Sequence, residues 1–510
     1  MRLKFLTVVA AAAAAAATPA LAQKSQDTLR IAINNPFAVL STYDLPVDES
    51  GIFNRDVYDY LIYYDEHEQK IVPGLAKSIT RIDHQTLELE LRDDIKFHNG
   101  DKFDADDVKM TVDYAIDPKA KITYPANYNW VKEIEKLGPY KIRIHSVEPI
   151  ATDMQLLAYR FPIYDSKVMG KLPEKQDYGR LSPIGTGIYK VVKLDSSTGI
   201  AVERYDAYNT TPKYKNASIK RIQGVWMPDR QTQAAQMMVG GVDLLRNIEQ
   251  ELAKSLSANP DVKVTYVPEM NLMYMALDSM NLSGNKALSD PRVRQAIHMG
   301  VDREELIKYV IPGGEVAEHI NADCFKAVAG CKYTTKPPAY DPEGAKKLLA
   351  EAGYPNGLDV NYVVYAPNKS IGEAIAGQLL KIGVRMTVQA DDIALYRRLQ
   401  GEGKLQAWSI LFPIGSYPDA GNVFNVLFTG PAAKYYNDDK LQDLMKQGLQ
   451  EFDPAKRAEI YAQAFDRVNT MHYHLPISSV PTVYVHSKDV EVKSDPFSAG
   501  QTYITDYAWK

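Results

Sequence analysis

One stretch of the chain gathers side chains that could hold a small molecule. Residues 407–428 read AWSILFPIGSYPDAGNVFNVLF and bring Trp408, Phe412 and Tyr417 close together in sequence. Aromatic rings of this kind form stacking walls in ligand sites, although a tryptophan in a strand serves equally well as core. Asp419 adds a carboxylate, which either meets a cationic ligand group or caps the helix that follows it. We interpret this stretch as a candidate binding segment.

Two neighbouring arginines precede that segment. Arg397 and Arg398 lie in DDIALYRRLQGEGK, and an arginine can bind a carboxylate or a phosphate through two parallel hydrogen bonds. Adjacent positions on a helix do not face the same way, so at most one of the two points toward a ligand. We take Arg397 as the candidate, with a solvated surface position as the alternative for either arginine.

Signatures of catalysis, nucleotide binding and metal binding are weak. The sequence has no Gly-x-Ser-x-Gly or His-Glu-x-x-His motif. Gly185 and Gly187 resemble a phosphate-binding loop, but strand patterns follow them where such a loop needs a helix. His472 and His474 form a close pair that would share one face of a strand, yet no further ligand stands at a recognisable spacing. We expect a protein that is not an enzyme and needs no cofactor or metal, with a secreted hydrolase as the alternative.

The two cysteines, Cys324 and Cys331, stand seven positions apart in NADCFKAVAGCKY. In an exported protein this spacing predicts one local disulfide, and two thiols alone are too few for a zinc site. Closing a loop of this size stabilises a fold by roughly 2.5 kcal/mol in the chain-entropy treatment.

The N-terminus predicts where the protein is located, and the chain length predicts how many lobes it has. Arg2 and Lys4 precede an apolar run that ends in Ala20-Leu21-Ala22, which is typical of a secretory signal peptide over residues 1–22. We expect export to the periplasm as a soluble chain. A chain of 510 residues exceeds what one hydrophobic core usually serves, so at least two lobes are expected. The net charge of −5 does not favour binding to nucleic acid.

The supporting elements are easy to read. Leu87, Leu89 and Leu91 alternate with glutamates as in a strand with one buried face. Asp104, with Asp107 three residues later, predicts a capped helix start. The second half of the chain repeats helix, glycine and strand, which is typical of α/β architecture.

Several motifs together resemble one family. VPGLAKS followed by LRDDIKFHNGDKFDADDV, then PIGTGIY, RQA and AEAGYP, occur in this order along the chain. They are similar to motifs of the extracellular solute-binding proteins of family 5, the receptors of peptide and nickel ABC importers. The resemblance implies a two-lobed α/β periplasmic binding protein fold (class II, cluster C type) with a two-crossing hinge near residues 276 and 480. It implies a first lobe of residues 23–50, 183–275 and 481–510, an additional subdomain of that lobe at 51–182, and a second lobe at 276–480.

The resemblance also implies ligand contacts. Tyr43 would border the cleft between the lobes. Peptide receptors of the family hold the ligand α-ammonium with an aspartate, and the matching position here is Ser416. Losing a hydrogen bond to a charged group costs about 1.5 to 3 kcal/mol, so a serine is a poor substitute. Either a shift of the loop lets Asp419 take that role, or the ligand lacks a free α-amine.

The function that the resemblance implies is that of a monomeric receptor. It would deliver a small solute, a peptide or peptide-like compound, to an inner-membrane ABC permease. The alternative is the same role for a non-peptide ligand, namely an opine, a sugar-phosphate, an oligosaccharide or a nickel complex.

Overall fold

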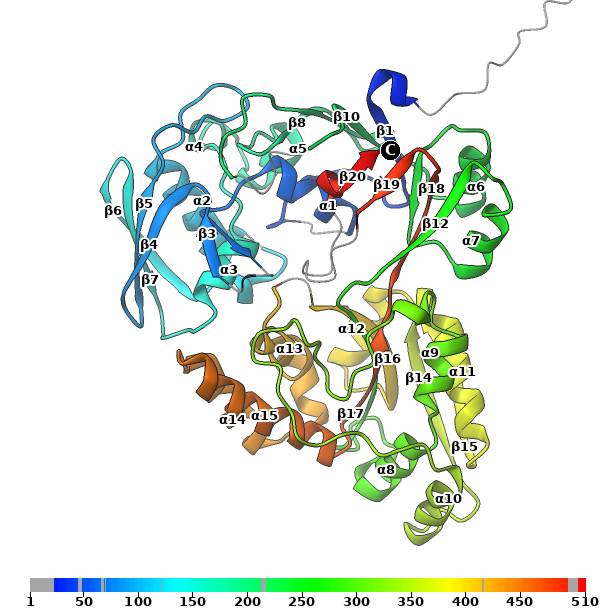
Figure 1. The fold of residues 1–510 in the computed structure, drawn as a ribbon. Helices are drawn as coiled ribbons and strands as arrows, with labels where there is room; N and C mark the ends of the chain where they lie inside the picture. Colours follow the sequence, from blue (N-terminus) through cyan, green and yellow to red (C-terminus); the bar gives the residue numbers. More distant parts are fainter. Residues whose placement is uncertain are drawn as a thin grey trace, which may run out of the picture.

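The computed structural model describes residues 23–44, 48–65, 68, 70–120, 122–211, 217–414, 417–493 and 503–510. The expected signal segment 1–22 and Ser416 lie outside these ranges. The described chain is a mixed α/β protein with two lobes, each built on its own sheet, and with a further antiparallel sheet at the side of the first lobe (Figure 1). The expected two-lobed α/β fold is confirmed. Within the described ranges, no helix combines the length and apolar character needed to span a membrane.

The first lobe carries a seven-stranded sheet assembled from separate parts of the chain. In spatial order its strands are β12 (Val262–Val267), β18 (Thr482–Ser487), β11 (Leu244–Arg246), β1 (Thr28–Ile33), β10 (Arg221–Trp226), β9 (Gly199–Arg204) and β8 (Tyr189–Asp195). Its helices are α1 (Asp48–Val57), α6 (Arg230–Met238) and α7 (Gln250–Leu256), and β19 (Val490–Val492) pairs with β20 (Tyr507–Trp509) nearby. β1 pairs in parallel with β10 and β11, whereas β8, β9 and β10 form an antiparallel meander.

The glycines of the PIGTGIY motif have a packing role. The β8–β9 hairpin follows Gly187, so no helix begins there and the phosphate-loop interpretation is excluded. A Cβ atom on Gly185 would lie 1.9 Å from the Val57 carbonyl oxygen, and one on Gly187 would lie 2.4 Å from the Asp56 oxygen. Glycine is required because the backbone passes directly against the end of α1.

The additional subdomain contains a four-stranded antiparallel sheet. Its strands, in spatial order, are β4 (Ala76–Asp83), β5 (Thr86–Leu91), β7 (Lys141–Ser146) and β6 (Val131–Gly138). It also holds the β2 (Ile62–Asp65) and β3 (Lys70–Pro73) hairpin and the helices α2 (Ala105–Ile116), α3 (Asp153–Arg160), α4 (Ser166–Met169) and α5 (Tyr178–Leu181). Leu87, Leu89 and Leu91 are all buried, as the alternation predicts. Asp104 and Asp107 form the predicted capping box at the start of α2.

The second lobe is built on a five-stranded mixed sheet. Its strands, in spatial order, are β15 (Val384–Asp391), β14 (Leu358–Tyr365), β16 (Ala407–Pro413), β13 (Asn271–Leu277) and β17 (His474–Ser479). Its helices are α8 (Pro291–Met299), α9 (Arg303–Tyr309), α10 (Pro342–Glu351), α11 (Lys369–Leu380), α12 (Ile393–Gly401), α13 (Ala420–Leu427), α14 (Asp439–Gln450) and α15 (Pro454–Thr470). Gly353 and Gly383 adopt positive φ where α10 and α11 give way to strands, which explains the repeated helix, glycine and strand pattern.

Two short passages of chain join the seven-stranded and five-stranded sheets. Residues 268–270 connect β12 to β13, and residues 480–481 connect β17 to β18. The first passage lies a few residues before the expected position near 276, because the whole of β13 belongs to the five-stranded sheet. The buried Glu269 carboxylate accepts hydrogen bonds from Asn271 Nδ2 (3.0 Å) and Thr482 Oγ1 (2.6 Å). One carboxylate thus ties the two passages together.

Candidate functional site

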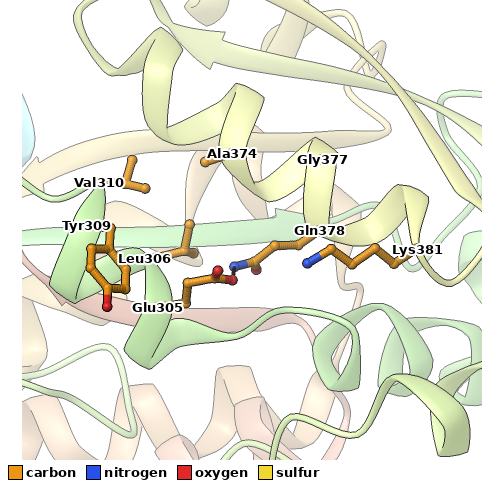
Figure 2. A pocket seen from close by; sticks show the side chains of 8 residues that line it. All are labelled: Glu305, Leu306, Tyr309, Val310, Ala374, Gly377, Gln378 and Lys381. Carbon is orange, nitrogen blue, oxygen red and sulfur yellow. Dashed lines mark hydrogen bonds between the residues drawn. The ribbon is translucent and has the colours of Figure 1, made fainter.

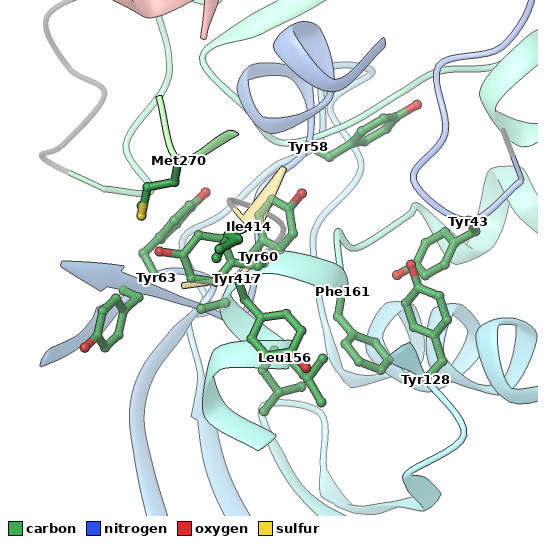
Figure 3. Packing of buried hydrophobic residues seen from close by; sticks show 14 of the residues in the cluster. Tyr43, Tyr58, Tyr60, Tyr63, Tyr128, Leu156, Phe161, Met270, Ile414 and Tyr417 are labelled. Carbon is green, nitrogen blue, oxygen red and sulfur yellow. The ribbon is translucent and has the colours of Figure 1, made fainter. Parts of the chain in front are cut away.

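Apolar and aromatic side chains of both lobes meet where the lobes face each other. We call this set the interlobe face; it is shown in Figure 3 and comprises Tyr60, Tyr63 and Leu156 of the additional subdomain, Met270 of the first passage, and Ile414 and Tyr417 of the second lobe. All six are buried in one continuous core. Amphipathic rings with polar tips suit a site that must hold a small solute, since they offer both packing surface and hydrogen bonds.

The segment after β16 is held in place by backbone hydrogen bonds. Ile414 N donates to the Met270 carbonyl (2.9 Å), which fastens this segment to the passage between the lobes. The buried Asn422 side chain donates to the carbonyls of Ile414 (3.2 Å) and Tyr417 (3.1 Å). The Asn422 amide therefore binds the backbone at Ile414 and at Tyr417, which fixes the position of Tyr417.

Asp419 has a structural role in this arrangement. Arg457 donates to its carboxylate with both terminal nitrogens, at 2.7 Å for Nη1 to Oδ2, and the two side chains are 8% and 0% exposed. Gly421 N also donates to Oδ1 (2.7 Å), so Asp419 caps α13. Its charge is neutralised within the second lobe. Of the two roles that the sequence allowed, the structure gives Asp419 that of the helix cap.

The predicted disulfide joins Cys324 and Cys331, whose Cα atoms lie 5.8 Å apart. The loop it closes packs against the start of α13. Ala329 N donates to the Pro418 carbonyl (3.0 Å), and Ala420 N donates to the Ala329 carbonyl (2.9 Å). The disulfide loop therefore supports the chain immediately after Tyr417.

The other sequence candidates fall in different places. Trp408, on β16, is 1% exposed and packs on Tyr435 with ring centroids 4.8 Å apart, within the same continuous core as the interlobe face. Phe412 lies further along β16, partly buried against the same core as the interlobe face. Arg397 is exposed on α12 and donates to Gln400 at 3.3 Å. Tyr43 is fully buried and donates its hydroxyl to the Pro162 carbonyl (2.8 Å), inside the additional subdomain. Of the candidates that the structure describes, only Tyr417 is part of the interlobe face.

Arg160 is a functional candidate that the sequence did not single out. It is the last residue of α3 and is half-buried, and its Nε atom is buried without a hydrogen-bond partner among the described residues. Burial raises the pKa of Tyr60 to about 12, an effect that the positive charges of Arg55 and Arg160 oppose. The Arg160 charge likewise opposes the burial-driven rise in the pKa of Tyr128 and Tyr417. The one sequence signal was a lone arginine inside the apolar run LLAYRFPI.

A second contact joins the lobes far from the two passages. Phe452, between α14 and α15, stacks on His84 with ring centroids 4.4 Å apart, and the Arg81 guanidinium carbon lies 4.7 Å from the same ring. Ala151 N donates to the Leu449 carbonyl at 2.8 Å. We call Arg81, His84 and Phe452 the distal clasp. It holds the additional subdomain against the second lobe.

The histidine pair is structural. His474 Nδ1 lies 2.6 Å from Asp323 Oδ2 and its Nε2 lies 2.7 Å from the Tyr436 hydroxyl, whereas His472 precedes β17 in a positive-φ turn. The two therefore do not share a strand face as predicted. In the part of the chain that the structure describes, no three His, Cys, Asp or Glu side chains are grouped as metal ligands.

The second lobe also has a surface groove of about 260 Å³ between α9 and α11 (Figure 2). Gln378 Nε2 donates to Glu305 Oε2 (2.9 Å) across it, and the Tyr309 side chain stands exposed at one end. α9 and α11 lie on the opposite side of the lobe from α13, so this groove is separate from the interlobe face (Figure 1).

Known proteins with the same architecture give this geometry its context. Residues 70–435 match the family described as "Bacterial extracellular solute-binding proteins, family 5 Middle". The glutathione-binding protein GsiB of Escherichia coli (strain K12) is 26% identical over 481 residues, which cover 90% of each chain. The structure resembles DppA from Helicobacter pylori in complex with peptide STSA (TM-score 0.78, 20% identity, 96% and 99% coverage). It also resembles NikA from Brucella suis in complex with Fe(III)-EDTA (TM-score 0.82, 21% identity, 95% and 100% coverage).

The family match spans more than half of the chain, and the fold agrees with it across both lobes. The motifs that carried the resemblance lie within the matched residues. The chain belongs to the bacterial extracellular solute-binding proteins, family 5.

Proposed function

We propose that this protein is a periplasmic receptor that captures a small solute between its two lobes and delivers it to an inner-membrane ABC permease. The observation that carries the proposal is the interlobe face. It draws residues from the additional subdomain, from the first passage and from the second lobe, and in the described ranges two short passages connect the sheets on either side. A ligand that contacts both lobes shifts such a molecule toward its closed form by its differential affinity for that form.

The ligand class follows from relatives and from chemistry. The relatives include a glutathione-binding protein and a structure with a bound tetrapeptide, which supports a peptide or peptide-like solute. Tyr417 supplies a ring and a hydroxyl for such a ligand. Phe412 and Ser416 precede it in sequence and complete the proposed contact segment from the second lobe. We assign the chain a binding role without catalysis, as a monomer released after removal of residues 1–22.

One observation favours a second candidate, the same role for a solute without a free α-ammonium. The Asp419 carboxylate is bound by Arg457 and by the start of α13, so it is not available to a ligand ammonium. An opine or another modified amino-acid derivative fits this constraint better than an ordinary peptide bound through its N-terminus.

The test is mass spectrometry of compounds released when the mature protein, purified from periplasm, is denatured. Thermal shifts against short peptides, glutathione, opines, sugars and nickel complement it. A spread of short peptides supports the first candidate, and one non-peptide compound supports the second. Hydrolysis of a peptide or ester by the purified protein, lost in Tyr417→Ala, would contradict a receptor role.

A further inference from the structure

The ribbon that joins the two lobes has a weak point in its backbone pairing. β12 pairs with β18 in the sheet of the first lobe, and β13 pairs with β17 in the sheet of the second lobe. Each passage between these pairs carries a proline, Pro268 in the first and Pro481 in the second. Proline has no N–H to donate to a strand ladder. A backbone hydrogen bond from Val480 N to the Asn271 carbonyl (2.9 Å) spans the passages, and side chains supply further links.

The Glu269 carboxylate accepts hydrogen bonds from both lobes. Thr482 Oγ1 (2.6 Å) and, at a longer distance, Tyr484 Oη (3.5 Å) lie on β18 of the first lobe. Asn271 Nδ2 (3.0 Å) lies on β13 of the second lobe. Glu269 is 8% exposed, so water competes little for its oxygens. Hydrogen bonds to a charged acceptor are stronger than neutral ones, and more so away from water.

The residue after Glu269 links this network to the interlobe face. Met270 is a member of that face, and its carbonyl accepts the hydrogen bond from Ile414 N (2.9 Å). A rotation of one lobe against the other turns the backbone of the passages, because they are the connections between the two sheets in the described ranges. Such a rotation moves the donors on β18 relative to Asn271, and it displaces Met270 together with Glu269.

We propose that Glu269 is a positioning residue that holds the lobes in the arrangement with the interlobe face assembled, and so sets the affinity for the solute without contacting it. This inference rests on the proposed receptor function. In this arrangement one carboxylate accepts hydrogen bonds from both sheets, and separation of the lobes draws these donors apart. Apparent affinity is proportional to the fraction of molecules in the competent arrangement, so Glu269 acts on affinity through that fraction.

The experiment measures the distance between the lobes in ligand-stripped mature protein by pulsed electron paramagnetic resonance. Spin labels are attached to Val147→Cys in the additional subdomain and to Lys446→Cys on α14 of the second lobe, both at exposed positions. The native cysteines are joined in the disulfide and do not react with the label. These positions lie on the two parts of the molecule that the distal clasp joins.

Two variants remove the network and one serves as the control. Glu269→Gln removes the charged acceptor, and Thr482→Val removes the donor from β18. The control is Thr265→Val, because Thr265 Oγ1 on β12 lies 2.8 Å from His486 Nε2 on β18. It is a threonine contact between the same two strands, but it lies inside the sheet of the first lobe. Melting temperatures are measured for all variants.

We expect the labelled parent and Thr265→Val to show a short-distance and a long-distance population. Glu269→Gln should lower the ratio of short to long by about tenfold, since it weakens hydrogen bonds to a charged group, and Thr482→Val should lower it in the same direction. An unchanged ratio in both variants, with a lowered melting temperature, would overturn the inference and make Glu269 a purely structural residue. A parent with the long-distance population alone would also overturn it. If Glu269→Gln does not fold, the ratio in Thr482→Val decides.

Compounds released on denaturation separate the inference from the proposed function. Glu269→Gln purified from periplasm should release about tenfold less compound than the wild type and Thr265→Val. Equal release from all three would overturn the role of Glu269 in affinity and leave the receptor function standing. If the wild type releases no compound, and glutathione and short peptides leave its distance distribution unchanged, the receptor function fails and the inference fails with it.

Discussion

Replacing Asp419 by asparagine distinguishes a structural carboxylate from a ligand anchor. The substitution keeps the shape of the side chain and an oxygen that can cap α13, since asparagine and aspartate are comparable N-caps. It removes the charge opposite Arg457, whose side chain is 8% exposed. Leaving one member of a buried ion pair without its partner destabilises a protein by about 3 to 5 kcal/mol. We therefore expect a loss near the lower end of that range in the second lobe.

Guanidinium unfolding followed by tryptophan fluorescence measures this effect, because Trp408 is buried in the second lobe and reports on its transition. Asp443→Asn, an exposed aspartate on α14, is the matched control and should leave the midpoint unchanged. The double variant Asp419→Asn with Arg457→Met should recover much of the loss, since it leaves no unpaired charge. If Asp419→Asn keeps the wild-type midpoint and instead abolishes ligand binding, Asp419 anchors the ligand and the structural assignment is refuted.

Three further predictions follow from the same structure. Replacing Cys324 and Cys331 by serine should lower the free energy of unfolding by roughly 2.5 kcal/mol and should speed amide hydrogen exchange at Ala420, because the disulfide loop accepts the Ala420 hydrogen bond. An unchanged exchange rate at Ala420 would show that the loop does not support this segment. Phe452→Ala should weaken ligand affinity about fivefold, because losing the ring contacts of the distal clasp disfavours closure by about 1 kcal/mol. Ile82→Ala, which replaces an exposed residue next to Arg81 on β4, should leave the affinity unchanged; equal affinities of the two variants would show that the clasp does not contribute to closure. His98 accepts a hydrogen bond from Gly185 N at Nδ1 and donates one from Nε2 to the Gly187 carbonyl, and burial lowers its pKa from 6.5 to about 4. The folded state therefore keeps His98 neutral, so its contribution to the free energy of unfolding is fully present above about pH 6.5, and roughly 3 kcal/mol of it is lost as pH falls toward 4. His98→Gln should flatten a plot of the free energy of unfolding against pH in that window.

Much of the fold was accessible from the sequence because local rules agree with one another. Local sequence rules correctly predicted the buried leucines of β5, the capping box of α2 and the glycines after α10 and α11. At these positions the tertiary structure agrees with the local preference. The cysteine pairing was also accessible, since the chain has only two cysteines and they stand seven positions apart. The position of the first passage was shifted by a few residues, because the sequence pattern of β13 does not reveal which sheet it joins.

The site was less accessible, because its members meet only through tertiary structure. Trp408 and Phe412 lie on the same face of β16 and pack toward the same core, and nothing local distinguishes the fully buried ring from the partly buried one. Asp419 could be assigned as a cap from its position, but its partner Arg457 comes from a distant helix. Arg160 is significant only because of what surrounds it after folding, which no spacing rule predicts.

The most direct test of the central claim is small-angle X-ray scattering of the ligand-stripped mature protein before and after the released compound is added back. A receptor that closes around its ligand at the interlobe face should show a smaller radius of gyration on binding, and Tyr417→Ala should weaken both the binding and this change. Binding of the compound at full occupancy without any change in radius, and with Tyr417→Ala indistinguishable from wild type, would contradict the account.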